Sequence, residues 1–248
     1  MLRKISVCLL AAFAAAALAQ AQTADELIEK NIQAHGGLDK IKGVQSMRMT
    51  GKIVGGGMEM PMLMEFKRPT NMRMEFTVQG MTGIQGYDGT TGWAVMPFVG
   101  KTEPEKMSPE DLKQMEDQAD IDGPLVDYKA KGHQVEYLGK ADVEGTPAHK
   151  LKVTKKNGDV VTLYLDADAF LEFKAEAKST RRGQEREVEM TFGDYKDVGG
   201  LVFAHSLEIK PKGMPQGQNV VIEKVELNPE IAADRFAMPP AKEAAKPS

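Results

Sequence analysis

Alternation of apolar and polar residues with a period of two runs through most of this 248-residue chain. Three such runs lie between Val44 and Gln79, separated by Gly55-Gly56-Gly57 and by Pro69-Thr70-Asn71. A period of two is the pattern of a β-strand whose two faces meet different surroundings. Further alternating runs follow at residues 84–87, 92–98, 133–139, 147–155, 160–166, 170–179, 185–193, 201–210 and 219–228.

The connections between these runs are short and carry turn residues. Asn157-Gly158, for example, is a strong two-residue hairpin turn. Helical crossovers between the runs are absent from the pattern, which argues against a parallel sheet. The sequence therefore predicts roughly a dozen strands in an antiparallel meander that forms one large curved sheet or an open barrel.

Two helices are predicted beside the strands. Thr23 to Glu26 has the spacing of a capping box, and the helix that it begins ends at Gly36-Gly37. His35 lies in the last turn of this helix and is interpreted as a helix-end residue rather than a ligand. A second helix begins at Ser108-Pro109 and carries Leu112 and Met115 on one face. Such an inserted helix is expected to cover one face or one mouth of the sheet.

The first 21 residues have the features of a cleaved secretory signal peptide. Arg3 and Lys4 precede an apolar segment at residues 5–18, which is too short to span a bilayer, and small residues follow it. The single cysteine, Cys8, lies inside this segment. We therefore expect an exported, periplasmic protein with no permanent membrane anchor. Residues 22–238 are predicted to form the folded domain, and residues 239–248 a disordered tail.

Methionine is unusually frequent, with 16 residues. Eight of them share one parity in the first three strands, and Phe66 and Phe76 continue the same face. Charged residues such as Arg48 and Glu65 take the other parity. The methionines of this face are Met47, Met49, Met58, Met60, Met62, Met64, Met72 and Met74.

Three interpretations of this face remain open. The first is a core that is packed with methionine. The second is the wall of a pocket for an acyl chain, since methionine adapts to variable apolar shapes. Burial of about ten methylenes contributes roughly 8 kcal/mol, which corresponds to micromolar affinity before ordering costs. The third is a Cu(I) site of thioethers at Met58, Met60, Met62 and Met64.

Motifs for catalysis are absent from the sequence. The four histidines are scattered, and no zinc-protease helix, nucleophile elbow, phosphate loop or dinucleotide pattern occurs. Asp166-Ala167-Asp168 is interpreted as a turn, and His149 and His205 as sheet residues. No enzymatic activity and no cofactor are therefore predicted. The net charge of −4, with both signs mixed along the chain, argues against a nucleic-acid partner.

Several short motifs, in their order, resemble one known family. They include His35-Gly36-Gly37, Tyr87-Asp88-Gly89 before Trp93, and residues 122–125, 145–153, 193–200 and 225–229. In this order the chain resembles the LolA/LolB-like superfamily of periplasmic outer-membrane lipoprotein-sorting proteins. The resemblance implies an α+β fold, mainly β, in which an incomplete barrel of about eleven strands is closed by an N-terminal helix and an inserted lid helix.

The resemblance also implies a function. Proteins of this superfamily hold acyl chains in a hydrophobic cavity, so the expected ligands are the acyl chains of a lipoprotein or lipid, shuttled toward the outer membrane. Components of inner- and outer-membrane transport are the implied partners, and a sensor module that recognises mislocalised lipoproteins is the alternative. Leu112 and Met115 would belong to the lid. The expected cavity wall consists of Met47, Met49, Met58, Met60, Met62, Met64, Phe66, Met72, Met74, Phe76 and Trp93.

Overall fold

The computed structural model describes residues 23–181 and 184–240. The expected signal peptide at residues 1–21, and residues 241–248 of the expected tail, lie outside the described residues. The helices are α1 (Ala24–Ala34), α2 (Leu38–Gly43) and α3 (Pro109–Gln118), with the short 3-10 helices η1 (Pro97–Val99) and η2 (Ala233–Arg235). The strands are β1 (Ser46–Gly55), β2 (Met58–Lys67), β3 (Asn71–Val78), β4 (Met81–Tyr87), β5 (Gly92–Met96), β6 (Lys101–Lys106), β7 (Gln134–Val143), β8 (Thr146–Thr154), β9 (Val160–Asp166), β10 (Glu172–Arg181), β11 (Gln184–Val198), β12 (Leu201–Pro211) and β13 (Gln218–Leu227).

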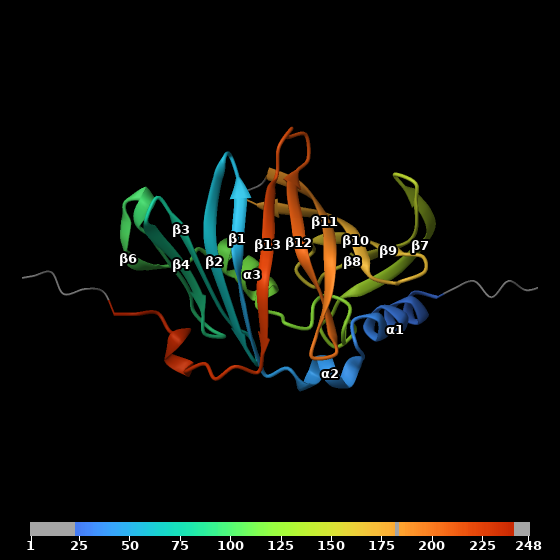
Figure 1. Cartoon of the computed structure of the whole chain (residues 1–248), viewed down its shortest axis with the longest axis horizontal. Helices are drawn as coiled ribbons and strands as arrows, with labels where there is room; N and C mark the ends of the chain where they lie inside the picture. The colour runs from blue at the N-terminus through green and yellow to red at the C-terminus, as the bar shows by residue number, and fades with distance from the viewer. Residues whose placement is uncertain (1–22, 182–183, 241–248) are drawn as a thin grey trace, which may run out of the picture.

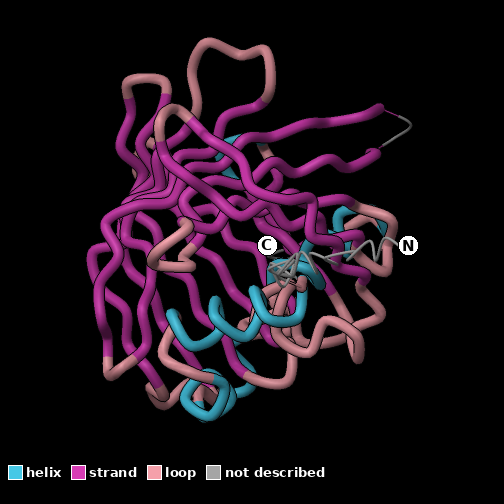
Figure 2. Tube along the Cα trace, turned by 90° about the vertical axis from the view of Figure 1, so that its right-hand side faces the viewer, coloured by secondary structure: helices cyan, strands magenta, loops and turns pink. Residues whose placement is uncertain are grey.

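All of these strands belong to one antiparallel sheet with the order β6-β5-β4-β3-β2-β1-β13-β12-β11-β10-β9-β8-β7. The sheet curves strongly around the helical segments and stays open, because β6 and β7 are both free edges (Figures 1 and 2). The predicted fold class is confirmed, with 13 strands in the described residues where the resemblance implies about eleven. One of the additional strands is β6, whose residues are mostly charged or polar and show no apolar alternation.

The first strand pairs with the last one in the middle of the sheet. Met47 lies opposite Leu227, and Ile53 lies opposite Val220. The sheet thus consists of an N-terminal arm, β1–β6, and a C-terminal arm, β7–β13, that meet at this seam. The concave surface is therefore assembled from both ends of the chain.

Helix α1 packs against the C-terminal arm. Its predicted capping box is present, because Thr23 Oγ1 accepts a hydrogen bond from the backbone N–H of Glu26 and the Glu26 carboxylate accepts one from the N–H of Thr23. Leu27 and Ile28 are buried in a cluster with Leu163 and other strand residues of this arm. Within the described residues, no helix combines the length and apolar character needed to span a bilayer.

Helix α3 packs against the N-terminal arm, as expected for an inserted covering helix. Its N-cap is Ser108, whose Oγ accepts a hydrogen bond from the N–H of Asp111 at 3.2 Å. Met115 is buried, and Leu112 is partly buried, in the cluster that also contains Met62 and Met72. The two arms are thus covered by different helices.

The outer face of the N-terminal arm is covered by the chain after β13. Trp93 is fully buried there, and its Nε1 donates a hydrogen bond to the backbone oxygen of Phe236 at 2.9 Å. Beside it, the buried carboxylate of Glu65 accepts hydrogen bonds from Arg48 at 2.9 Å and Arg235 at 2.6 Å. Parts of the apolar face and of the charged face of this arm are therefore both buried, by different segments.

Candidate functional site

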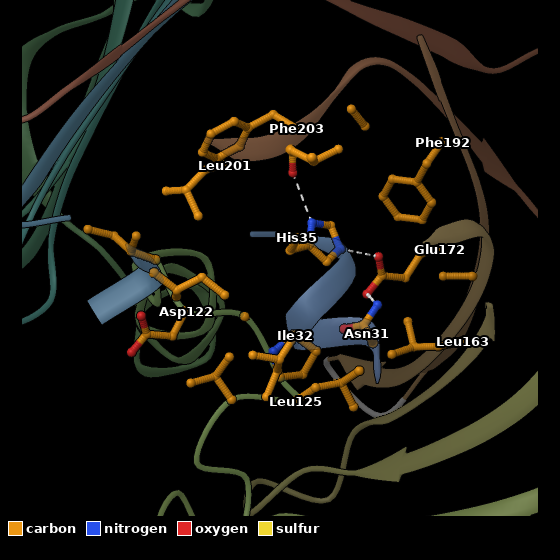
Figure 3. A pocket seen from close by; sticks show the side chains of 18 of the residues that line it. Asn31, Ile32, His35, Asp122, Leu125, Leu163, Glu172, Phe192, Leu201 and Phe203 are labelled. Atoms are coloured by element: carbon orange, nitrogen blue, oxygen red, sulfur yellow. Dashed lines mark hydrogen bonds and ion pairs between the residues drawn. The ribbon is translucent and has the colours of Figure 1, made fainter. Parts of the chain in front are cut away.

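An apolar pocket of about 440 Å³ lies on the concave side, between α1, residues 121–126 and the strands of the C-terminal arm. Met47 of β1 also lines it, so the pocket reaches the seam between the arms. Figure 3 shows apolar side chains of several elements surrounding the pocket. They include Ile32, Leu125, Leu163, Phe192, Leu201 and Phe203.

Six polar side chains line the pocket; Asp122 and Lys155 pair with groups outside it, and the other four form one hydrogen-bonded cluster. Glu172 at the start of β10 accepts a hydrogen bond from His35 Nε2 at 2.7 Å and another from Asn31 Nδ2 at 3.0 Å. Asn31 Nδ2 also lies 2.8 Å from the backbone oxygen of Phe170. Tyr195 donates its hydroxyl proton to the backbone oxygen of Glu172. The contacts of Glu172 with His35 and Asn31 are drawn in Figure 3 and connect α1 to β10, and Tyr195 connects β10 to β11.

The contacts of His35 fix its charge. Its Nε2 faces the Glu172 carboxylate, and its Nδ1 lies 2.9 Å from the backbone oxygen of Val202. Both partners are acceptors, so both ring nitrogens donate and the ring is an imidazolium. Burial lowers the pKa of His35, but the hydrogen bond and negative charge of Glu172 outweigh it and raise the pKa above 6.5.

The two other titratable groups of the cluster, Glu172 and Tyr195, keep the charge states that these hydrogen bonds require. Burial by itself raises the pKa of Glu172, but the hydrogen bond and positive charge of His35 lower it below 4.5. Burial raises the pKa of Tyr195, so that its hydroxyl stays protonated. These polar atoms bind one another and the backbone. The pocket therefore presents an apolar surface with a fixed internal ion pair, which suits an apolar ligand.

A buried ion pair holds the segment that forms one wall of the pocket. The carboxylate of Asp122 lies 2.5 Å from Arg68 Nη2 and 2.5 Å from Lys42 Nζ. Arg68 also donates to the backbone oxygens of Val44 and Ile41. Burial raises the pKa of Asp122, but Arg68 and Lys42 lower it by more. Asp122 thus fastens residues 121–126 to α2 and to the turn between β2 and β3.

The strand register confirms that the eight methionines share one face. Met47 pairs with Phe66, which pairs with Met72, and the next row is Met49, Met64 and Met74. Farther along, Met62 lies opposite Phe76, Met60 opposite Ile53, and Met58 opposite Gly55. We call this surface the methionine face; it comprises Met47, Met49, Met58, Met60, Met62, Met64, Met72 and Met74 with Phe66 and Phe76.

Among the residues expected to form the cavity wall, Met47 lines the apolar pocket. Met62 and Met72 are buried, whereas Met58 at the far end is exposed. The expected lid residues, Leu112 and Met115, pack in the same cluster as this face. The methionine face is therefore an apolar layer that leads from the pocket toward the end of β1. A second hollow, of about 600 Å³, lies between α3 and β3–β6 and is lined by Met74, Met96, Met107 and Met115 together with polar residues.

Trp93 lies on the other side of the sheet. It pairs with Gly86, and a Cβ atom on Gly86 would lie only 2.4 Å from its ring. The guanidinium of Arg73 lies 5.5 Å from the centre of the indole ring. Trp93 thus anchors the sheet beneath the C-terminal segment, and the register does not bring it to the methionine face.

Other expected features have local explanations. The Asp166 carboxylate accepts from the N–H groups of Asp168 and Ala169, as a turn residue does. His149 and His205 are buried in strands, where His149 bonds the hydroxyl of Tyr137 and His205 the backbone oxygen of Ile222. In the part of the chain that the structure describes, no group of three His, Cys, Asp or Glu side chains is arranged to hold a metal ion.

Sequence reasoning did not identify the polar cluster of Asn31, His35, Glu172 and Tyr195 as part of a site. The sequence pattern predicts only that His35 ends a helix, and His35 is indeed the C-cap of α1. Its partner Glu172 lies 137 positions farther along the chain. The available indications were His35-Gly36-Gly37 and the segment 193–200 around Tyr195, both of which carry the family resemblance.

Neither a family model nor a curated protein sequence matches this chain. Solved structures do. A LolA superfamily protein from Nitrosomonas europaea has a TM-score of 0.59 at 13% identity, over 88% of this chain and 98% of its own. A DUF1329 family protein from Desulfovibrio piger has a TM-score of 0.59 at 10% identity, with the same coverage. A domain from Vibrio parahaemolyticus, described as an outer membrane lipoprotein-sorting protein, has a TM-score of 0.55 at 12% identity, over 84% and 97%. This chain therefore has the LolA-like fold.

Proposed function

We propose that this protein is a periplasmic carrier that binds an acyl chain of a lipoprotein or lipid and moves it toward the outer membrane. The observation that carries the proposal is the 440 Å³ apolar pocket on the concave face, whose polar side chains are paired within the protein. The fold, which it shares with a domain described as lipoprotein-sorting, supports the same function. So does the expected signal peptide at residues 1–21.

An acyl chain is the ligand that this wall suits. Each buried methylene contributes about 0.8 kcal/mol, so about ten of them supply roughly 8 kcal/mol without a polar contact. The methionine face extends the apolar surface beyond the pocket, and flexible thioether side chains adapt to chains of different shape. The polar cluster holds α1 against the pocket wall rather than acting in catalysis, since His35 holds its proton toward Glu172 and Tyr195 is bonded to backbone.

Release of such a ligand requires a movable cover. We assign this role to α3, which lies on the methionine face through Leu112 and Met115. Outward displacement of this helix exposes the face, whereas residues 121–126 stay fixed by Asp122. Transport components at the inner and outer membranes are the proposed partners that drive this step.

A matched pair of variants tests the binding site. Phe192 lines the pocket, and its neighbour Thr191 on the same strand is exposed. We expect Phe192→Asp to weaken binding of a fluorescent fatty acid by at least about tenfold, because it places a charge in an apolar wall. Thr191→Asp should leave the affinity unchanged. Native mass spectrometry of the exported protein should show a hydrophobic adduct. Failure of the delipidated protein to bind any acyl probe contradicts the proposal.

Copper binding is a second candidate, because Met49, Met64 and Met74 lie side by side on three adjacent strands. Three thioethers are a ligand set that Cu(I) accepts. The expected copper ligands Met58, Met60, Met62 and Met64 all lie on β2, and Met64 belongs to this row. Met64→Leu separates the two functions, since leucine keeps the apolar surface but removes a sulfur. A carrier of acyl chains keeps its affinity for the fatty acid, whereas a copper protein loses metal.

A further inference from the structure

Exposed apolar side chains are concentrated in a few turns of the sheet. In the described residues, six large apolar side chains are exposed. Four of them lie at or beside turns: Met58 (45% exposed), Met81 (39%), Val99 (64%) and Met214 (57%). The other two are Leu38 in α2 and Leu138 in the middle of β7. We call the first four residues the apolar rim.

The topology places these four turns next to one another. The turns β5–β6, β3–β4, β1–β2 and β12–β13 connect antiparallel strands that are consecutive in the sheet order. They therefore follow one another at the same end of the sheet, along the upper edge in Figure 1. Strands lie about 4.8 Å apart, so neighbouring tips are separated by about 10 Å. Four consecutive tips thus each carry an exposed apolar side chain.

The turns at the opposite end of the sheet provide an internal comparison. They contain mostly polar, glycine and small residues; Phe170 and Leu171 in one of them are partly buried, and none of the six exposed large apolar side chains lies in these turns. Among the turns that the structure describes, an exposed large apolar side chain thus occurs at one end of the sheet and not at the other. The turns at that end are residues 68–70, 88–91, 144–145, 167–171 and 199–200.

The tips of the apolar rim project freely. Each of the four turns contains glycine with positive φ, around which a Cβ atom would meet nothing within 4 Å. These glycines are Gly56, Gly57, Gly80, Gly100 and Gly213. The exposed side chains beside them are therefore accessible to a flat or extended surface.

Lysines accompany two of the tips. Lys101 lies two positions from Val99, and Lys212 two positions from Met214; their side chains are 56% and 74% exposed. Each makes a surface ion pair, with Glu105 and Glu187 respectively. Such exposed pairs contribute little stability, so either lysine can exchange its partner for a phosphate. Apolar side chains beside lysines match the acyl and phosphate layers of a membrane interface.

We infer that the apolar rim docks on the surface of a phospholipid bilayer. A bilayer suits four tips about 10 Å apart, because fluid lipid closes around separate side chains. A protein partner requires a contiguous, closely packed patch instead. The methionine face ends at Met58, which belongs to the rim. If the pocket holds an acyl chain as proposed above, this face gives the chain an apolar path to the bilayer; that second part rests on the proposed function.

Flotation with vesicles tests the docking. The chain purified after export is mixed with vesicles of phosphatidylethanolamine and phosphatidylglycerol. Each single serine substitution in the rim should lower the partition coefficient by about fivefold, since part of one side chain no longer enters the lipid. The fourfold variant Met58→Ser, Met81→Ser, Val99→Ser and Met214→Ser should lower it by at least about 100-fold. Substituting Leu38 and Leu138 with serine, equally exposed but elsewhere, should leave it unchanged.

Two further measurements complement the flotation experiment. Met214→Trp should show blue-shifted emission and quenching by brominated lipid, while Trp93 is buried and gives a constant background; Leu38→Trp should show neither. Removing phosphatidylglycerol should weaken binding if Lys101 and Lys212 contact headgroup phosphate. Absence of flotation by the wild-type protein overturns the inference, and so does equal binding by the rim and control variants. Loss of self-association or of protein binding in the rim variant, with flotation intact, assigns the rim to a protein partner and also overturns it.

Different variants test the membrane docking and the proposed carrier function, so each can be refuted without the other. The threefold variant Met81→Ser, Val99→Ser and Met214→Ser, which leaves Met58 of the methionine face in place, should keep the wild-type affinity of the pocket for a fluorescent fatty acid. Phe192→Asp should keep its flotation with vesicles. A protein that floats with vesicles but binds no acyl probe supports the docking and contradicts the carrier function. A protein that binds the probe but does not float supports the carrier function and contradicts the docking.

Discussion

Replacing Glu172 with glutamine keeps the size of the side chain and removes its charge. In the wild-type pocket, His35 donates to Glu172 at 2.7 Å and to the oxygen of Val202 at 2.9 Å, and Asn31 donates to the other carboxylate oxygen. A glutamine has one acceptor oxygen, so if it accepts from Asn31, its amide N–H group faces His35 Nε2, which can then no longer carry a proton. The imidazolium loses its charged partner, and His35 becomes neutral in the variant.

The size of the expected destabilisation follows from the contact between His35 and Glu172. A hydrogen bond to a charged group contributes about 1.5–3 kcal/mol. The side chains of His35 and Glu172 are 25% and 17% exposed, which weakens the interaction by solvent screening. We expect Glu172→Gln to lower the free energy of unfolding by about 2 kcal/mol. The raised pKa of His35 and the lowered pKa of Glu172 describe one interaction, so their effects are not added.

The pH dependence of this destabilisation tests the charge states assigned to His35 and Glu172. The pKa of His35 is raised above 6.5 by folding, so its contribution is complete below pH 6.5 and is lost as the pH rises through the folded pKa. The pKa of Glu172 is lowered below 4.5, so its contribution is complete above pH 4.5 and is lost as the pH falls through the folded pKa. The difference between wild type and variant should therefore be largest between pH 4.5 and 6.5 and narrow on either side.

Urea denaturation followed by Trp93 fluorescence measures this difference at several pH values. Glu105→Gln serves as the control, because Glu105 and Lys101 form an exposed pair whose loss should change stability by less than about 0.5 kcal/mol. A destabilisation that is constant from pH 5 to pH 9 refutes the charged state assigned to His35. A variant as stable as wild type at pH 5.5 refutes the role of the ion pair altogether.

Three more results are expected. Asp122→Asn should destabilise the protein by about 3 kcal/mol in thermal or urea unfolding, because Arg68 is left without its buried partner; an unchanged midpoint contradicts the role of this pair. Phe236→Ala should cost about 3–5 kcal/mol, since it empties a fully buried site in the C-terminal segment, and a smaller loss in urea unfolding would mean that this segment collapses into the space. Fatty acids that are longer by one methylene should bind about fourfold tighter until the pocket is full, as measured by displacement of a fluorescent probe; an affinity that does not change with chain length excludes apolar burial as the driving force.

Much of the fold is predictable from local patterns of apolar and polar residues. Alternation along β1, β2 and β3 sufficed to predict the methionine face, because side chains alternate with a fixed period and short turns keep neighbouring strands in register. Strand β6 escaped prediction, because a free edge in solvent needs no apolar face and is occupied by lysine and glutamate. Alternation of apolar and polar residues thus indicates that one face of a strand is buried, and it cannot predict a strand that is exposed on both faces.

The candidate site depends on long-range pairing that no local pattern encodes. The seam between β1 and β13 and the contact of His35 with Glu172 join residues far apart in the chain. Trp93 shows a different limit, because its face depends on the number of residues in the turn before β5. Tyr87 pairs with Gly92, which turns Trp93 toward the outer face. An apolar residue next to a turn was therefore not enough to assign a side of the sheet.

The central position of β1 and β13 constrains how the molecule can be made. A chain that leaves a ribosome or a translocation pore from its N-terminus presents β1 first, but the partner of β1 on one side is the last strand to emerge. Each arm can form hairpins early, whereas the seam has to wait for residues 218–227 and then close a very long loop, which slows folding. During this wait β1 has an unpaired edge, so the nascent chain depends on rapid completion or on a chaperone to avoid aggregation.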